Sequence, residues 1–473
     1  MAVALASGCE PATPQREHLA ETNQLVVDRT GQKFDSGKLL QFDERHEAAP
    51  PEGILTLDDA VARSLQHNYA LVASAESLTI ARAEVAQASL IQNPTLAESS
   101  GLLFPFYSHA LPSFDVNISQ AINSILTQPA RVRVARLQEL QAQIDLATQA
   151  FSLSQQALSK YQELSHIVRS QRIAQRVVEV YDRAVKAAEA RQQVGLIPMP
   201  ELNRARLNYT DAVRQVRHLT TQYTRAAQEM NWLMGHSTAP LWKLPEDELQ
   251  PPATLAPPPP VPSLAVLGQK YRLDLLRADF DRQLGDYGVK LAKAGLFPPL
   301  TVGGEFARDN AHHWSGGPFF SIGLPIFDPG IVALTLAEDQ QRKAVKTYLS
   351  LQGQVRQDVQ TAVANYQIAE DDLTFFREKL MPQQEQNVRL MQESFRLGND
   401  DLDALLNTLH DYVTSLQSYE DTTQAYQAAS TALQAAVGIS WDQMMRQTGA
   451  ATQPAPAPRN TTLPQTSTSE PKS

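Results

Sequence analysis

The side chains most suited to a chemical role form an acidic cluster near the end of the chain, at Asp400, Asp401 and Asp403. If several copies meet around a pore, these carboxylates would favour cations, as rings of acidic side chains do in cation channels. Acidic residues at the start of a helix also stabilise it by opposing the positive end of its dipole. The sequence leaves both interpretations open.

Other sets of reactive side chains are sparse. His312 and His313 are adjacent and precede Trp314, but a zinc site needs more convergent ligands than two neighbouring histidines. We therefore expect an exposed loop there. No nucleophile–base set, phosphate loop or zinc motif is recognisable, so we expect no enzyme, no catalytic or metal site and no cofactor. A net charge of -10 also provides no basic surface for nucleic acid.

The single cysteine, Cys9, follows Ala6-Ser7-Gly8 and precedes Glu10. Small residues before a cysteine near the N-terminus resemble a bacterial lipobox, in which the cysteine is acylated. An unmodified cysteine is the alternative, because residues 1–8 lack the charged and apolar regions of a full signal peptide.

The hydrophobic pattern alternates between helical and strand periods. Residues 55–92 read as one helix with Thr56 as its N-cap, ended by Asn93-Pro94. Two strand pairs follow the two-residue period. We place the first pair at 95–104 and 112–122, and the second around 300–306 and 320–326, with a polar loop at 308–317.

A very long helix follows each strand pair. The first runs from Ala130 to Gln193, and its length favours coiled-coil packing over an ordinary bundle helix. The second begins at Ile331 and contains Pro382, which predicts a kink or restart. No run approaches the ~20 apolar residues of a spanning helix, so membrane insertion would need another architecture.

The chain is a duplicated unit. With a shift of 203 residues, Gly195 falls on Gly398 and Gly235 on Gly438, and both glycines of the first pair lie in turns between long helices. We therefore divide the chain into five parts. They are a leader with an extended segment at 1–53, a first repeat at 54–235, a proline-rich linker at 236–262, a second repeat at 263–440 and a disordered tail at 441–473.

Four strands of about ten residues have the right length to cross a bilayer when tilted. A four-stranded sheet alone would leave unsatisfied edges in lipid, and spanning barrels start at about eight strands. The chain must therefore oligomerise, and three copies would supply twelve strands and twelve long helices. The predicted fold class is mainly α with a small β part, trimerising into a 12-stranded barrel continued by an α-helical barrel.

This layout resembles the TolC-type outer-membrane efflux protein family over residues 54–440. The motifs that carry the resemblance are Leu57-Asp58-Asp59-Ala60 with His67-Asn68, Asn93-Pro94-Thr95-Leu96, Phe297-Pro298-Pro299-Leu300, Gly323-Leu324-Pro325-Ile326-Phe327-Asp328-Pro329-Gly330, Val194-Gly195-Leu196 and Arg396-Leu397-Gly398. Each motif is short, and their order and repetition make the match specific.

The resemblance implies a homotrimeric duct in the bacterial outer membrane, with a long periplasmic extension. Its partners would be a periplasmic adaptor, an inner-membrane pump and outer-membrane lipid, and Cys9 would be acylated. The adaptor would dock on the turns formed by Val194, Gly195, Leu196, Arg396, Leu397 and Gly398. Asp400, Asp401 and Asp403 would line the aperture. Asn407 stands where the family often has an aspartate, so the constriction would carry a different charge.

A structural coiled-coil scaffold of the periplasm, without channel activity, is the alternative interpretation. A scaffold has no use for two strand pairs, and the sequence therefore favours the channel. The exported compound, which could be a drug, a metal ion, a peptide or a protein, is not determined by the sequence.

Overall fold

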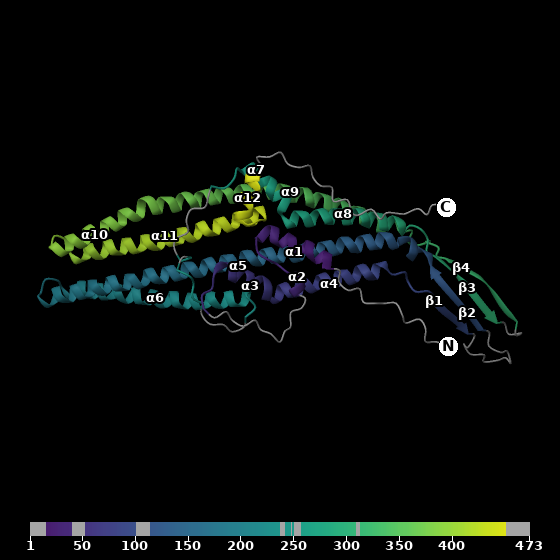
Figure 1. Cartoon of the computed structure of the whole chain (residues 1–473), viewed down its shortest axis with the longest axis horizontal. Helices are drawn as coiled ribbons and strands as arrows, with labels where there is room; N and C mark the ends of the chain where they lie inside the picture. Colours follow the sequence, from purple (N-terminus) through teal and green to yellow (C-terminus); the bar gives the residue numbers. More distant parts are fainter. Residues whose placement is uncertain are drawn as a thin grey trace.

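The computed structural model describes residues 16–39, 53–100, 114–236, 242–246, 248–249, 257–308 and 313–450. The molecule is elongated, with a small sheet at one end and the turns of two helical hairpins at the other (Figure 1). Long helices connect the two ends. This arrangement confirms the predicted fold class of a mainly helical chain with a small β part.

The strands form one antiparallel sheet in the order β1-β2-β3-β4. They are β1 (Thr95–Ser100), β2 (Phe114–Ala121), β3 (Leu300–Arg308) and β4 (Trp314–Ile322). Gly303 of β3 lies so close to Ile118 of β2 that a Cβ at this position would overlap the Ile118 backbone. Among the residues that the structure describes, β1 and β4 each have one unpaired edge.

The boundaries of the second strand pair differ from the prediction. The apolar alternation continues through Leu324 and Ile326, but β4 ends at Ile322. Pro325 has no N–H for a strand ladder, so the chain leaves the sheet before it. The polar loop is also shorter than predicted, because β3 extends to Arg308 and β4 begins at Trp314.

The first repeat contains α3 (Leu57–His67), α4 (Tyr69–Ser89), α5 (Ile122–Gln193) and α6 (Met199–Leu233). Thr56 caps α3 as predicted, since its hydroxyl accepts from the Asp59 N–H at 3.2 Å. The single helix predicted from 55 to 92 is wrong at Asn68. There the side-chain oxygen accepts from the N–H groups of Ala70 and Leu71, which starts a separate helix.

The second repeat contains α7 (Val261–Tyr271), α8 (Leu273–Ala294), α9 (Ile331–Phe375), the π-helical turn η1 (Phe376–Leu380), α10 (Met381–Leu397) and α11 (Leu402–Val437). The predicted interruption at Pro382 is confirmed. Proline cannot donate to the carbonyl four residues earlier, and the wider turn η1 stands directly before it.

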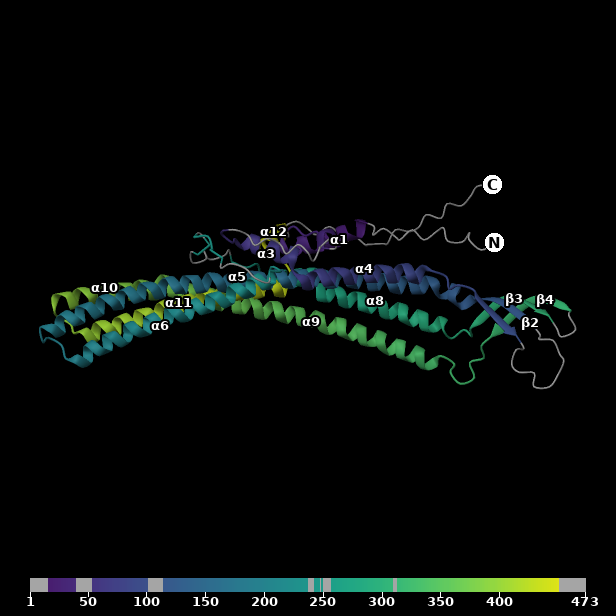
Figure 2. The same cartoon turned by 90° about the horizontal axis from the view of Figure 1, so that it is seen from below.

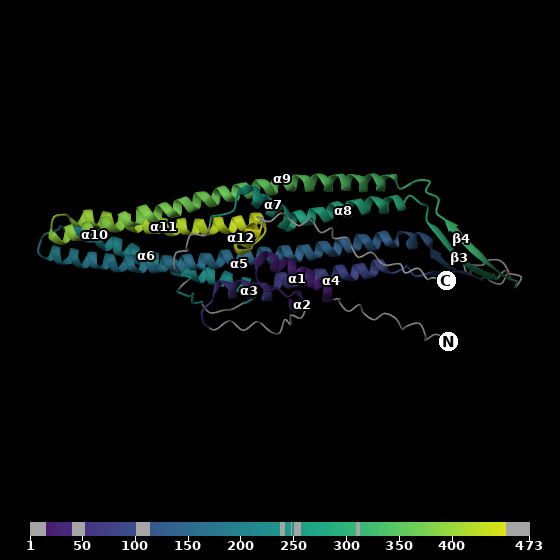
Figure 3. The same ribbon diagram turned by 45° about the horizontal axis from the view of Figure 1, so that its top comes forward.

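The long helices form an open slab that is four helices wide. At the sheet end the order is α4-α5-α8-α9, and at the hairpin end it is α6-α5-α11-α10 (Figures 1 and 3). Helix α5 has 72 residues, about 108 Å at 1.5 Å per residue, and it runs through both levels. The slab therefore has two edges: α4 and α6 on one side, α9 and α10 on the other.

Short helices form a belt on one face of the slab, near its middle (Figure 2). The belt includes α1 (Arg16–Thr30), α2 (Ser36–Leu39) and α12 (Trp441–Ala450). Arg29 of α1 donates its Nε–H to the Tyr271 carbonyl at 2.9 Å, and the Arg29 carbonyl accepts from the Ser440 N–H at 2.7 Å. Helix α1 thus connects the start of the chain to the second repeat.

The belt corrects two predictions about the ends of the chain. The leader is helical over 16–30 rather than extended, because Val26 is fully buried there. The segment predicted as a disordered tail begins with α12, whose Trp441 and Met444 are buried. Trp242 and Leu244 of the linker are buried too, and the Trp242 indole N–H donates to the Asn231 side chain, so this part of the linker packs on α6. Residues 451–473 lie outside the described residues.

None of the helices in the described ranges is long and apolar enough to cross a membrane.

Candidate functional site: the two hairpin turns and the contacts between them

The first turn joins α5 to α6. Gly195 has a φ of 75°, and the Leu196 N–H bonds to the Arg191 carbonyl at 2.9 Å, which closes the end of α5. Nothing lies within 4 Å of the place where a Gly195 Cβ would be, so the conformation, and not the space, favours glycine. Val194 and Leu196 are exposed at the turn.

The second turn joins α10 to α11 and repeats this geometry. Gly398 has a φ of 80°, and the Asn399 N–H bonds to the Ser394 carbonyl at 3.0 Å. Leu397 is exposed, and Arg396 pairs with Glu393 at 2.6 Å on the outer surface. All six residues predicted for adaptor docking therefore lie at two neighbouring turns at the end of the molecule remote from the sheet.

The three carboxylates of the acidic cluster have different surroundings. Asp401 is the N-cap of α11 and accepts from the Ala404 N–H at 2.8 Å. Asp403 accepts from Arg204 of α6 at 2.9 Å. The same guanidinium donates to the side-chain oxygen of Asn407 at 3.0 Å. Asp400 is partly exposed, and no residue in the described ranges pairs with it.

A second arginine also crosses between the hairpins. Arg191 of α5 donates to the Phe395 carbonyl of α10 at 3.0 Å, and its guanidinium lies 3.7 Å from the Phe395 ring centroid. Such a stacked cation contributes about 0.5–1 kcal/mol at exposed sites. Beneath these contacts, Leu202, Leu405 and Leu409 belong to a buried cluster shared by both hairpins. Arginines of the first repeat thus hold the second hairpin at two places.

Sequence reasoning missed Arg191 and Arg204. The 203-residue shift contains the signal, because it places Arg204 at the position of Asn407. At this point equivalent residues of the two repeats lie side by side, because Arg204 bonds to Asn407. The shift marks the two positions as equivalent, but it does not show that they touch.

A buried charged pair lies farther along the same helices. Arg169 of α5 donates its Nε–H to Glu420 of α11 at 2.9 Å, and their side chains are 5% and 7% exposed. His166 lies 3.9 Å from Glu420, and burial lowers its pKa despite the nearby carboxylates. His166 and Glu420 line a cavity of about 860 Å³ between α5, α6 and α11.

The described residues contain no group of three His, Cys, Asp or Glu side chains that could hold a metal ion. Trp314, predicted in a loop with His312 and His313, is the first residue of β4. His312 and Cys9 lie outside the described residues. The described helices form one long wall, and arginine contacts join the two hairpins at the end remote from the sheet.

Comparison with known proteins agrees with this geometry. Residues 267–439, which run from α7 to just beyond α11, match the family described as Outer membrane efflux protein. The second repeat of the chain is therefore similar to this family. This match supports an efflux-channel function for the chain.

Individual known proteins match this chain over most of their length. The cobalt-zinc-cadmium resistance protein CzcC of Cupriavidus metallidurans is 24% identical over 368 residues, which cover 76% of this chain and 84% of CzcC. The outer membrane protein VceC of Vibrio cholerae has a TM-score of 0.66 at 17% identity and covers 81% of this chain and 96% of its own. The open state of the MtrE channel of Neisseria gonorrhoeae gives 0.66 at 15% identity, over 81% and 89%.

Proposed function

We propose that this protein is the outer-membrane duct of a tripartite export system and works as a homotrimer. The observation that carries the proposal is the pair of unpaired sheet edges, on β1 and β4. Exposed strand edges cannot be satisfied in lipid, but β4 of one copy can pair with β1 of the next. We take three copies, the number that the resemblance to TolC-type channels implies.

The helical slab supports the same closure. Its edge helices α4 and α6 lie on the β1 side of the molecule, and α9 and α10 lie on the β4 side (Figure 1). A head-to-tail interface that closes on itself generates a ring. Three slabs would give a helical tube continuous with the barrel, and the two buried clusters that contain residues of both repeats would keep each slab together.

We further propose that a periplasmic adaptor docks on the hairpin turns. Val194, Leu196 and Leu397 are exposed apolar side chains at the free end of the tube, with Arg396 beside them. An adaptor that binds the separated hairpins better than the closed ones would shift the population toward an open duct. Arg204 and Arg191 hold the closed state in this scheme, and Asp400 remains available to meet cations at the aperture.

We propose divalent metal cations as the cargo, supported by the sequence relation to CzcC, whose name specifies cobalt, zinc and cadmium resistance. An inner-membrane pump would supply the energy. We also propose a lipid anchor on Cys9, which mass spectrometry of the mature N-terminus would test by detecting or failing to detect an acylated cysteine.

The decisive experiment is to purify the chain in detergent, measure its mass by native mass spectrometry and insert it into a planar bilayer. A trimer that conducts in discrete steps supports the duct. A monomer that remains soluble without detergent would favour the scaffold alternative. Conductance that discriminates against Zn²⁺ relative to K⁺ would argue against metal cargo while leaving the duct intact.

A further inference from the structure

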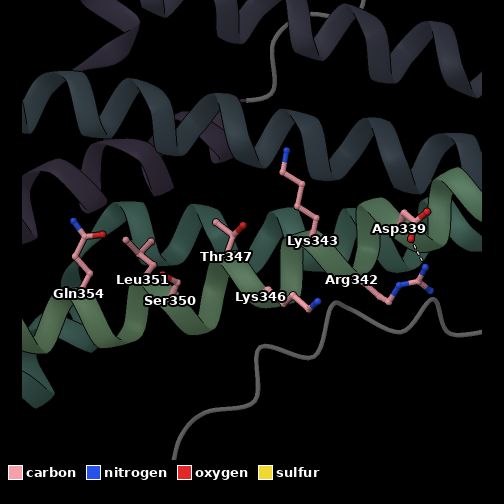
Figure 4. A pocket seen from close by; sticks show the side chains of 8 residues that line it. All are labelled: Asp339, Arg342, Lys343, Lys346, Thr347, Ser350, Leu351 and Gln354. Atoms are coloured by element: carbon pink, nitrogen blue, oxygen red, sulfur yellow. Dashed lines mark hydrogen bonds and ion pairs between the residues drawn. The ribbon is translucent and has the colours of Figure 1, made fainter.

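Helices α4 and α9 form the two edges of the slab at its sheet end. Each exposes a face that, in the inner helices α5 and α8, is covered by a neighbouring helix. On α4, exposed positions recur every three or four residues, at Tyr69, Ala73, Glu76, Ile80, Ala83 and Gln87. On α9, the exposed face includes Asp339, Lys343, Lys346, Thr347 and Ser350, which line a shallow hollow of about 510 Å³ (Figure 4). A spacing of three and four residues is typical of helices that pack along a seam.

The chain contains a model for such a seam, between α5 and α8. Gln141 of α5 donates to Asp281 of α8 at 2.6 Å, and Arg277 of α8 pairs with Asp145 of α5 at 2.9 Å. The two helices run antiparallel, so residue numbers increase along α5 in the direction in which they decrease along α8.

The duplication relates this internal seam to the two exposed faces. Helix α8 corresponds to α4 with a shift of 204 residues, and α9 corresponds to α5 with a shift of 202. The second shift follows from burial: the residues 202 positions after Leu153, Ala157, Tyr161 and Leu164 are Val355, Val359, Val363 and Tyr366, and all eight are buried.

A contact seen in both repeats supports the two shifts. Arg82 of α4 pairs with Glu139 of α5 at 3.3 Å. The equivalent positions in α8 and α9 are Asp286 and Gln341, whose side chains bond at 2.6 Å. The seam between α4 and α5 therefore recurs between α8 and α9 in the same register. By the same rule, the seam between α5 and α8 should recur between α9 and an α4 that belongs to another copy.

We propose that α9 of one copy packs against α4 of the next in the register of the internal α5–α8 seam, with Glu76 between Lys343 and Lys346 of the neighbour. This inference rests on the proposed trimer and specifies its interface. In the internal seam Gln141 contacts Asp281, and their equivalents are Lys343 and Ser77. Lys343 would therefore lie opposite Ser77. The position opposite Glu76 is the next residue along α9. Lys346 lies about one helical turn farther along.

Charge complementarity supports this register. Arg342 pairs with Asp339 on α9, whereas Lys343 and Lys346 form no ion pair within the described part of the chain (Figure 4). On α4, the Glu76 carboxylate accepts from the Thr79 hydroxyl at 3.1 Å and has no cationic partner among the described residues. Two unpaired cations on one edge thus match an unpaired anion on the other.

Crosslinking tests the register directly. Ala73→Cys and Thr347→Cys occupy the positions that correspond to Arg277 and Asp145, and they leave Glu76 and both lysines intact. A short bismaleimide should join each copy to the next and produce a covalent trimer on a denaturing gel. The matched control combines Ala73→Cys with Thr361→Cys, which is also exposed but 14 residues away, about 21 Å along α9. The unmodified chain controls for Cys9.

A charge exchange tests the ion pair. Glu76→Lys should lower the temperature at which the trimer dissociates in detergent, and adding Lys343→Glu and Lys346→Glu should restore most of the loss. Equal crosslinking of both cysteine pairs, or a charge exchange without rescue, would overturn the interface while native mass spectrometry still finds trimers. If no trimer forms for the unmodified chain, the proposed duct itself fails.

Discussion

Arg204 of the first hairpin donates to Asp403 of the second at 2.9 Å and to Asn407, its own equivalent in the other repeat, at 3.0 Å. One arginine therefore joins the two hairpins, which the proposed opening of the duct would separate. The three carboxylates of the acidic cluster differ in their partners. Asp401 caps α11, Asp403 accepts from Arg204, and Asp400 has no partner among the described residues.

Removing this contact should open the duct. An exposed pair contributes about 0.5 kcal/mol, so Arg204→Ala should raise the open population roughly twofold per copy, or about tenfold if three copies open together. Planar-bilayer recordings at low salt would measure the change. Arg206→Ala is the matched control, because Arg206 pairs with Glu189 within the first hairpin at 2.8 Å and similar exposure. An equal effect of both substitutions would show that the contact between hairpins has no special role.

The buried pair between Arg169 and Glu420 should stabilise the fold only while both charged partners are present. Glu420→Gln leaves the Arg169 charge without its counterion, and breaking a buried pair costs about 3–5 kcal/mol. Replacing both residues, as Arg169→Met with Glu420→Leu, should recover much of this loss because no buried charge remains. Chemical unfolding of the detergent-solubilised protein would measure both. A double variant less stable than Glu420→Gln would contradict this account.

His166 should make the protein less stable in mildly acidic solution. Burial lowers its pKa in the folded chain below the unfolded value of about 6.5, so the unfolded state binds the proton first as the pH falls. The free energy of unfolding should be constant above that value and decrease below it, by at most about 1.4 kcal/mol per pH unit, until the folded pKa is reached.

A comparison of variants isolates the contribution of this histidine, because burial also lowers the pKa of His67. His166→Gln should flatten the decline between about pH 6.5 and pH 5, whereas His218→Gln, at an exposed site on α6, should leave it unchanged. Identical pH profiles for the unmodified chain and His166→Gln would refute the assignment.

The sequence predicts most of this architecture because hydrophobic period and turn residues are local properties. The strand pairs, the glycine turns and the break before Pro382 follow from residues within one or two turns of each feature. Asn68 was missed because an asparagine inside a helical pattern acts as a cap only when its side chain turns back to Ala70 and Leu71. The belt was missed because Val26 and Trp441 are buried only through contacts with distant helices.

The contacts between hairpins required knowledge of the packing. Arg204 reads as an ordinary surface arginine of α6 until α11 is placed beside it. The 203-residue repeat indicates which positions are equivalent, but not that equivalent positions touch. The Gly398 turn alone also does not show which residues of α9 and α5 are equivalent. The numbering shift between the repeats is 202 in α9 but 203 at Gly398.

The numbering shift between the repeats increases from 202 in α9 to 203 at Gly398, so the second repeat has one additional residue between them. We place this residue in η1. A π-helical turn accommodates a single extra residue within an α-helix, and the Phe376–Leu380 turn stands between the part of α9 with the shift of 202 and the Gly398 turn with the shift of 203. Deleting the exposed Glu378 should therefore convert the turn to regular α-helix and leave the residues on both sides in their present orientation. Deleting the exposed Glu179 of α5, which has no such turn, should rotate Tyr181 and Ala184 by about 100° out of the core and unfold the hairpin. Thermal unfolding and native mass spectrometry of the two deletions would decide, since equal losses of stability would mean that η1 does not hold an extra residue.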